Sequence, residues 1–121
     1  MTPIVDYVRR LEIVLCAEED VYRRLKAVLR REESELVELD PASVERTTGE
    51  KQALAAEARL HEESRIEVMK HLAALIGAPT DRPRLSELNA LLGEQAGPLP
   101  ELHARLSALI AATRSLLGAN E

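Results

Sequence analysis

Apolar residues recur in alternating steps of four and three along the first third of the chain. This is the heptad spacing of a helix that packs lengthwise against another helix. Neither Gly nor Pro occurs between Ile4 and Leu39, so the pattern predicts one helix of about 35 residues, roughly 50 Å long. The stripe consists of Ile4, Val8, Leu11, Leu15, Glu18, Tyr22, Leu25, Leu29, Glu32, Leu36 and Leu39, with Val14, Val21 and Val28 on one side.

A second helix is predicted to start at Asp40-Pro41. Asp is a favoured N-cap, and Pro is favoured in the first helical position. Gly77 and Pro79 are expected to end this helix. Its stripe again advances in threes and fours, through Val44, Thr47, Lys51, Leu54, Ala58, His61, Arg65, Val68, Leu72 and Leu75.

The polar interruptions of the two stripes match when the helices are folded into an antiparallel hairpin. Glu18 then faces His61 or Arg65, and Glu32 faces Thr48 or Lys51. We expect these polar pairs to fix the register and direction of the hairpin more than they add to its stability.

The segment RTTGEKQAL (46–54) tests whether the second helix is continuous. Thr47-x-x-Glu50 fits a capping box, which would allow a fresh helix start. However, Val44 and Leu54 keep the same phase on either side. We therefore interpret Gly49 as a helix-interior residue that costs about 1 kcal/mol relative to Ala.

Beyond the hairpin (about 3–77), the residues GAPTDRP (77–83) predict a connector. A short leucine-rich helix over 84–92 and a second break at 93–100 follow. An amphipathic helix then reaches about residue 117, so that 1–121 form one all-α domain. Its stripe must face the hairpin, a second copy or another protein. The stripe comprises Leu99, Leu102, Leu106, Leu109, Thr113 and Leu116, with Ile110 and Leu117 alongside.

The composition of the chain favours a helical fold and disfavours one class of function, nucleic-acid binding. Charged residues make up 31% of the chain and aromatic residues 2%, which favours helices with aliphatic seams. The net charge of −5 disfavours nucleic-acid binding. The arginine pairs at 9–10, 23–24 and 30–31 lie beside acidic residues and are interpreted as a solvated face. A nucleic-acid-binding hairpin is the weakest alternative.

The single Cys16 fits a reducing compartment and is expected to be half-buried. Charged residues interrupt the N-terminal apolar stretch, so neither a signal peptide nor a membrane span is predicted. We expect a cytoplasmic protein without membrane insertion.

Catalytic motifs are missing from the sequence. It contains no phosphate-binding glycine loop, no CxxC and no HExxH, and none of its three histidines completes the Glu-x-x-His motif of di-iron bundles. Glu57, His61, Glu62 and Glu63 could contribute to a metal site, but an interhelical polar pair with solvated carboxylates accounts for them. We expect no enzyme, no cofactor and no metal.

The order of features resembles the FlgN family of flagellar export chaperones. The resemblance rests on Glu33-x-x-Leu36, then LDPASV, GEKQAL with Lys51 and Leu54, LHEESR with Leu60 and Arg65, and LAALIG. It covers most of residues 20–117 and is a pattern of spaced residues rather than a sharp motif.

The resemblance implies a cytoplasmic chaperone that binds hook–filament junction subunits (FlgK/FlgL-like). It would prevent their early assembly and deliver them to the export apparatus. The client contact would lie on the C-terminal helix, at Leu102, Leu106, Leu109, Ile110, Thr113, Leu116 and Leu117. The family chain usually runs further than GANE (118–121). Either the protein is short or a tail is missing from this chain, and part of the client site is then absent. The alternative function is a structural or adaptor coiled coil, a homodimeric scaffold without a secretion role.

Overall fold

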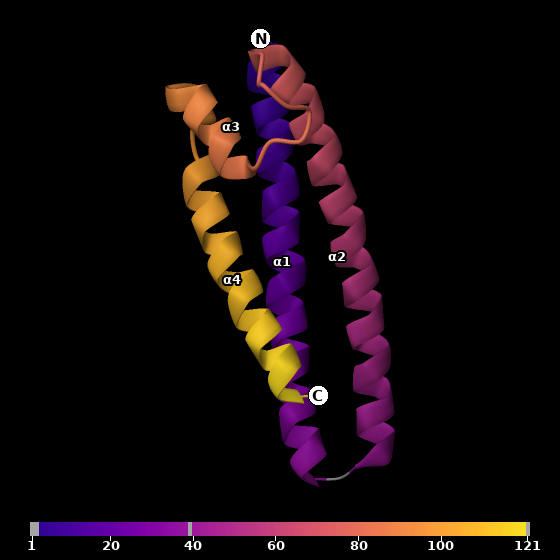
Figure 1. Ribbon diagram of the computed structural model, residues 1–121. Helices are drawn as coiled ribbons and strands as arrows, with labels where there is room; N and C mark the ends of the chain where they lie inside the picture. Colours follow the sequence, from indigo (N-terminus) through magenta and orange to yellow (C-terminus); the bar gives the residue numbers. More distant parts are fainter. Residues whose placement is uncertain (1–2, 39, 121) are drawn as a thin grey trace.

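The computed structural model describes residues 3–38 and 40–120, which form helices joined by short turns. Helix α1 (Pro3–Glu38) and helix α2 (Pro41–Ile76) make an antiparallel hairpin (Figure 1). After a connector come α3 (Leu85–Leu92), a short 3-10 helix η1 (Gly93–Ala96) and α4 (Leu99–Asn120). The predicted all-α class, with its hairpin, short third helix and C-terminal helix, is confirmed.

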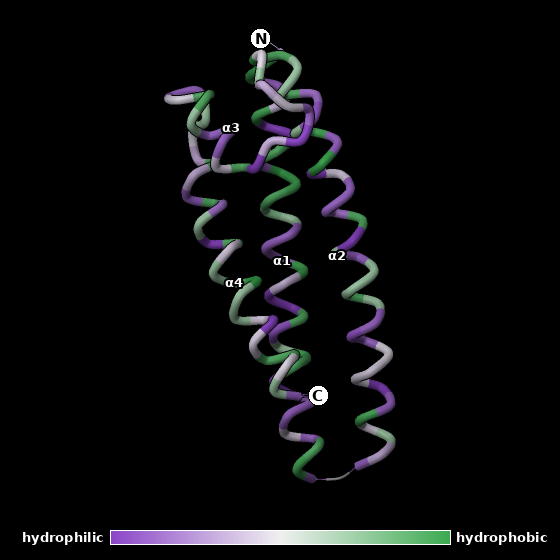
Figure 2. The backbone as a smooth tube through the Cα atoms, viewed as in Figure 1, coloured by the Kyte–Doolittle hydropathy of each residue, from purple (hydrophilic) through white to green (hydrophobic). Residues whose placement is uncertain are grey.

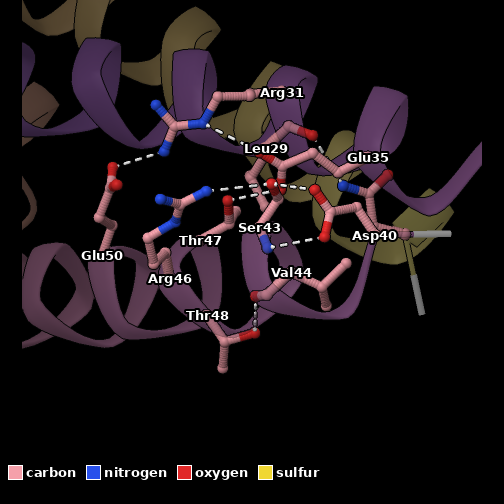
Figure 3. Close-up of polar contacts among 11 residues, drawn as sticks. Leu29, Arg31, Glu35, Asp40, Ser43, Val44, Arg46, Thr47, Thr48 and Glu50 are labelled. Atoms are coloured by element: carbon pink, nitrogen blue, oxygen red, sulfur yellow. Dashed lines mark hydrogen bonds and ion pairs between the residues drawn. The ribbon is translucent and has the colours of Figure 1, made fainter. Parts of the chain in front are cut away.

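The ends of α2 are set by the residues that the sequence indicated. Asp40 has an extended backbone and accepts hydrogen bonds from the backbone N–H groups of Ala42 (3.2 Å) and Ser43 (3.5 Å). Figure 3 shows Asp40 beside Ser43. The Ser43 hydroxyl donates to the same carboxylate over 2.7 Å, and these bonds lower the pKa of Asp40. At the other end, Gly77 adopts the left-handed conformation (φ 68°) that terminates helices.

The RTTGEKQAL segment is continuous helix, as its phase predicted. The Thr47 side chain is buried against α1, where its hydroxyl donates to Glu35 Oε2 over 2.6 Å (Figure 3). Thr48 instead donates to the carbonyl of Val44 one turn earlier, over 2.9 Å. The capping-box alternative is therefore wrong for this segment.

The largest apolar cluster lies at one end of the molecule, where the start of α1, the end of α2, α3 and the start of α4 meet (Figure 1). Beyond this cluster α4 continues along α1 until Asn120 contacts Leu29 and Glu32, and only the tip of the hairpin consists of two helices (Figure 1). Figure 2 shows apolar and hydrophilic residues alternating along the helices, as amphipathic packing requires. The cluster contains Val8, Leu11, Leu15, Met69, Leu72, Ala73, Leu85, Leu88, Leu92, Ala96, Leu99, Leu102 and Leu106.

Some details differ from the sequence-based expectation. Leu36 and Leu75 of the predicted stripes are 41% and 43% exposed. Leu36 lies near the tip of the hairpin, whereas Leu75 lies at the end of α2 that carries the main cluster, where Leu72, Ala73 and Ile76 make the contacts instead. Cys16 is exposed rather than half-buried, because it lies outside the interhelical face of α1. The predicted break at 93–100 contains η1, and α4 continues to Asn120. Leu39 lies outside the described residues.

Candidate functional site

Helix α4, which carries the stripe predicted to bind a client, lies along α1 and runs in the same direction (Figure 1). The side chains of this stripe differ in how deeply they are buried. Leu102, Leu106 and Thr113 are buried against the rest of the chain. Leu109, Ile110 and Leu116 are half-buried, and Leu117 is 37% exposed.

The two halves of α4 are anchored differently. Leu99, Leu102 and Leu106 belong to the main apolar cluster. From residue 107 onward the only fully buried side chain among the described residues is Thr113, whose hydroxyl donates to its own helix at the Leu109 carbonyl (2.8 Å). The first half of α4 is therefore part of the core, whereas the second half makes shallower contacts.

Two polar contacts hold α4 to α1. Near its start, Arg105 donates from Nε and Nη2 to Glu19 Oε2, each over 3.2 Å. In its last turn, the Asn120 amide donates to the Leu29 carbonyl (2.9 Å) and to Glu32 Oε1 (3.0 Å). We call these contacts the Arg105 clasp and the Asn120 clasp.

The structure brings the interrupting polar residues of the hairpin together. Arg65 Nε lies 2.8 Å from Glu18 Oε1, although neither atom has a well-aligned hydrogen bond among the described residues. Lys51 donates to Glu32 Oε2 over 2.8 Å. His61 is one turn from Glu57 and lies 3.5 Å from its carboxylate, so that Arg65 is the ion-pair partner of Glu18.

Two of the three buried glutamates in the described part of the chain, Glu18 and Glu32, have pKa values shifted in opposite directions. Burial raises the pKa of Glu18, and the charge and hydrogen-bonding capacity of Arg65 only partly oppose that rise. Burial also acts to raise the pKa of Glu32, but hydrogen bonds from Lys51 and Asn120 outweigh it and lower the pKa. Glu32 is thus the carboxylate at which α1, α2 and α4 are connected.

Sequence reasoning missed both clasps. Glu19 is next to the stripe residue Glu18, and its burial depends on a helix that arrives 86 residues later. Asn120 gave no signal, because an amide near a chain end fits no periodic pattern. The position of Arg105, one residue before the stripe residue Leu106, was the only available hint.

Metal chemistry finds no support in the described part of the chain. No group of three or more His, Cys, Asp or Glu side chains there could hold a metal ion. Within residues 3–38 and 40–120, no helix is long and apolar enough to cross a membrane.

Comparison with known families decides the assignment. The family model described as "FlgN protein" matches residues 1–121, the whole chain. The chain belongs to the FlgN family. Membership implies the role of a flagellar export chaperone, in a family not known for enzymatic activity. No curated protein and no solved structure matches this FlgN-family chain.

Proposed function

We propose that this FlgN-family chain binds hook–filament junction subunits (FlgK/FlgL-like) in the cytoplasm, prevents their early assembly and delivers them to the export apparatus. The observation that carries this proposal is the two-part anchoring of α4. Its first half is built into the core, and its second half offers apolar side chains that the chain itself covers only in part.

The half-buried side chains suit a reversible contact. Leu109, Ile110, Leu116 and Leu117 retain accessible surface. At roughly 25 cal/mol per Å2, covering such a stripe contributes several kcal/mol before the cost of ordering the partner. An amphipathic helix of the client would supply the complementary surface.

Affinity capture from flagellated cells tests the proposal, with the full chain as bait and hook–filament junction subunits identified in the eluate. Leu109→Asp/Leu117→Asp should abolish their recovery, because both side chains are accessible without entering the main cluster. Ala111→Asp/Ser115→Asp is the matched control, since these positions of α4 are exposed. Leu102 and Leu106 are avoided because they are core residues. Recovery of no junction subunit by the unaltered chain would overturn the proposal.

A second candidate is the adaptor or homodimeric scaffold. Large apolar side chains on the hairpin favour it, since Ile13, Val37 and Leu60 are 69%, 81% and 63% exposed. Sedimentation velocity separates the two functions. A scaffold would sediment as a dimer that Ile13→Ser/Leu60→Ser dissociates, and it would capture no junction subunit.

A further inference from the structure

Helices α1, α2 and α4 leave a depression between α2 and α4 that has α1 as its floor. Two hollows of about 390 Å3 and about 260 Å3 lie along it, and the connector and the start of α3 also line the first, through Pro83, Arg84, Leu85 and Ser86. We call this depression the α2–α4 valley. The apolar lining of the first hollow includes Leu15, Met69, Leu106 and Ile110, and that of the second includes Tyr22, Leu25, Ala55, Ala58 and Leu117.

The valley has the dimensions of a helix-binding site. Its α4 wall extends from His103 to Leu117, which is about 21 Å at 1.5 Å per residue. That length corresponds to roughly four helical turns. On the α2 side of the second hollow, the small side chains of Ala55 and Ala58 lie beside the longer Arg59 and Glu62. A fourth helix laid between α2 and α4 would cover this lining and complete a bundle.

The charge of the lining is opposite to that of the whole chain. Four arginines and one glutamate line the two hollows, whereas the net charge of the chain is −5. Arg65 and Arg84 are compensated by Glu18 and Glu87. The other two arginines, Arg59 and Arg114, are exposed. Neither forms an ion pair with any carboxylate of the described residues.

We propose that the α2–α4 valley binds an amphipathic helix of the client, about four turns long, whose apolar stripe is flanked by acidic residues. The apolar stripe lies on the α1 floor, and the acidic flanks face Arg59 on α2 and Arg114 on α4. Helix α4 keeps its place on α1 and forms one wall of the site. The identity of the occupant as a client segment rests on the proposed function.

The apolar stripe of α4 is therefore divided between the face that lines the valley and the opposite face of the helix. Ile110 and Leu117 line the valley. Leu109 lies on the other side of α4, in a shallow hollow that it shares with Glu19, Arg23 and Arg105. The valley therefore requires Leu117 and does not require Leu109.

Fluorescence anisotropy with two designed peptides tests the site without knowledge of the client. Both probes are labelled amphipathic helices of about four turns with a leucine stripe, one flanked by Glu and the other by Lys. The Glu-flanked peptide should bind about tenfold more tightly than the Lys-flanked one, and Arg59→Glu/Arg114→Glu should reverse this preference. Equal binding of the two peptides would overturn the proposal.

Filling the valley provides the steric test. Ala55→Leu and Leu117→Asp should each weaken the Glu-flanked peptide about tenfold. Ala53→Leu on the exposed face of α2 and Leu109→Asp are the matched controls and should bind as the unaltered chain does. Circular dichroism and thermal melts establish that the variants are folded. Binding that survives Ala55→Leu would refute the valley as the site.

Two further outcomes separate this inference from the proposed function. Junction subunits captured by the Ala55→Leu variant as well as by the unaltered chain would overturn the valley and leave the function standing. A chain that captures no junction subunit, yet binds the Glu-flanked peptide in the valley, would retain the site and lose the function. A dimer that Ala55→Leu converts to monomer would assign the valley to a second copy and overturn the proposal.

Discussion

Asn120, in the last turn of α4, donates a hydrogen bond to Glu32 of α1 across 3.0 Å. The other oxygen of the same carboxylate accepts from Lys51 of α2 over 2.8 Å. A single buried side chain thus joins the end of α4 to both helices of the hairpin. In the second half of α4 the apolar side chains Leu109, Ile110 and Leu116 are only half-buried, so this polar contact adds to the attachment of that half.

Asn120→Ala should loosen the second half of α4 without unfolding the hairpin. The variant loses the bonds to Leu29 and Glu32, and we expect a loss of about 1 kcal/mol of stability. Hydrogen exchange measured by mass spectrometry should accelerate in residues 107–120 and stay unchanged in α1 and α2. Ser115→Ala, at an exposed position of α4, is the control. Unchanged exchange in 107–120 would show that the clasp does not hold this half.

The unfolding free energy should depend on the ionisation of Glu32. Its pKa is lowered in the folded state from a reference of 4.5, so the unfolded chain binds the proton more readily. The resulting stabilisation is present above that reference value and is lost as the pH falls through the lowered pKa. Glu32→Gln should therefore be less stable than the unaltered chain at neutral pH, and the difference should shrink below pH 4.5.

Urea denaturation over a series of pH values measures this difference. Glu33→Gln is the matched control, because it removes the same charge from an exposed neighbouring position. A difference between the unaltered chain and Glu32→Gln that stays constant through acid pH would contradict the link to ionisation.

Gly49→Ala should stabilise the protein. Gly49 is interior to α2, and an added Cβ would meet nothing within 4 Å. Replacement removes the conformational entropy that Gly loses in a helix, worth about 1 kcal/mol, so the melting temperature should rise. Gly77→Ala is the contrasting variant. At φ 68° the same substitution strains the backbone by about 1 kcal/mol and should lower the melting temperature. A fall in melting temperature for Gly49→Ala would mean that the segment needs Gly.

The hairpin could be predicted from the sequence because its determinants are local and periodic. Asp40, Pro41 and Gly77 mark helix ends through their own backbone preferences, and each occupies the expected position. The heptad phase also predicted that Glu18 faces His61 or Arg65 and that Glu32 faces Thr48 or Lys51, and the structure pairs them with Arg65 and Lys51.

The site was harder to predict, because the burial of α4 depends on where the connector returns the chain. Thr113 and Leu117 belong to the same sequence stripe, yet they are 1% and 37% exposed. The second half of α4 packs on α1, and a helix with a single neighbour buries a narrower face than the width of its apolar stripe suggests. The lining of the α2–α4 valley combines residues of three helices, so no single stretch of sequence contains its signal.

The Glu18–Arg65 pair should set the register of the hairpin more than its stability. Arg65→Ala leaves a carboxylate that is 2% exposed without its cation. We expect the free energy of unfolding to fall by about 2 kcal/mol. This is less than the loss seen when a fully buried pair is broken, because the Arg65 side chain is a quarter exposed. Arg65 opposes the rise in the pKa of Glu18, so in Arg65→Ala this pKa should rise further. The stability difference between Arg65→Ala and the unaltered chain should therefore shrink as the pH falls and Glu18 takes up a proton.

Replacing both partners separates register from stability. Glu18→Leu/Arg65→Leu should recover most of the stability lost in Arg65→Ala, because an apolar pair incurs no desolvation of charge. In the same variant α1 and α2 should be able to slide along each other into another register, because a contact between leucines is not directional. Single cysteines placed on α1 and α2 should then form disulfides in more than one register, whereas the unaltered hairpin should form only the register that pairs Glu32 with Lys51. A doubly substituted hairpin that cross-links in that register alone would assign register to the apolar seam instead.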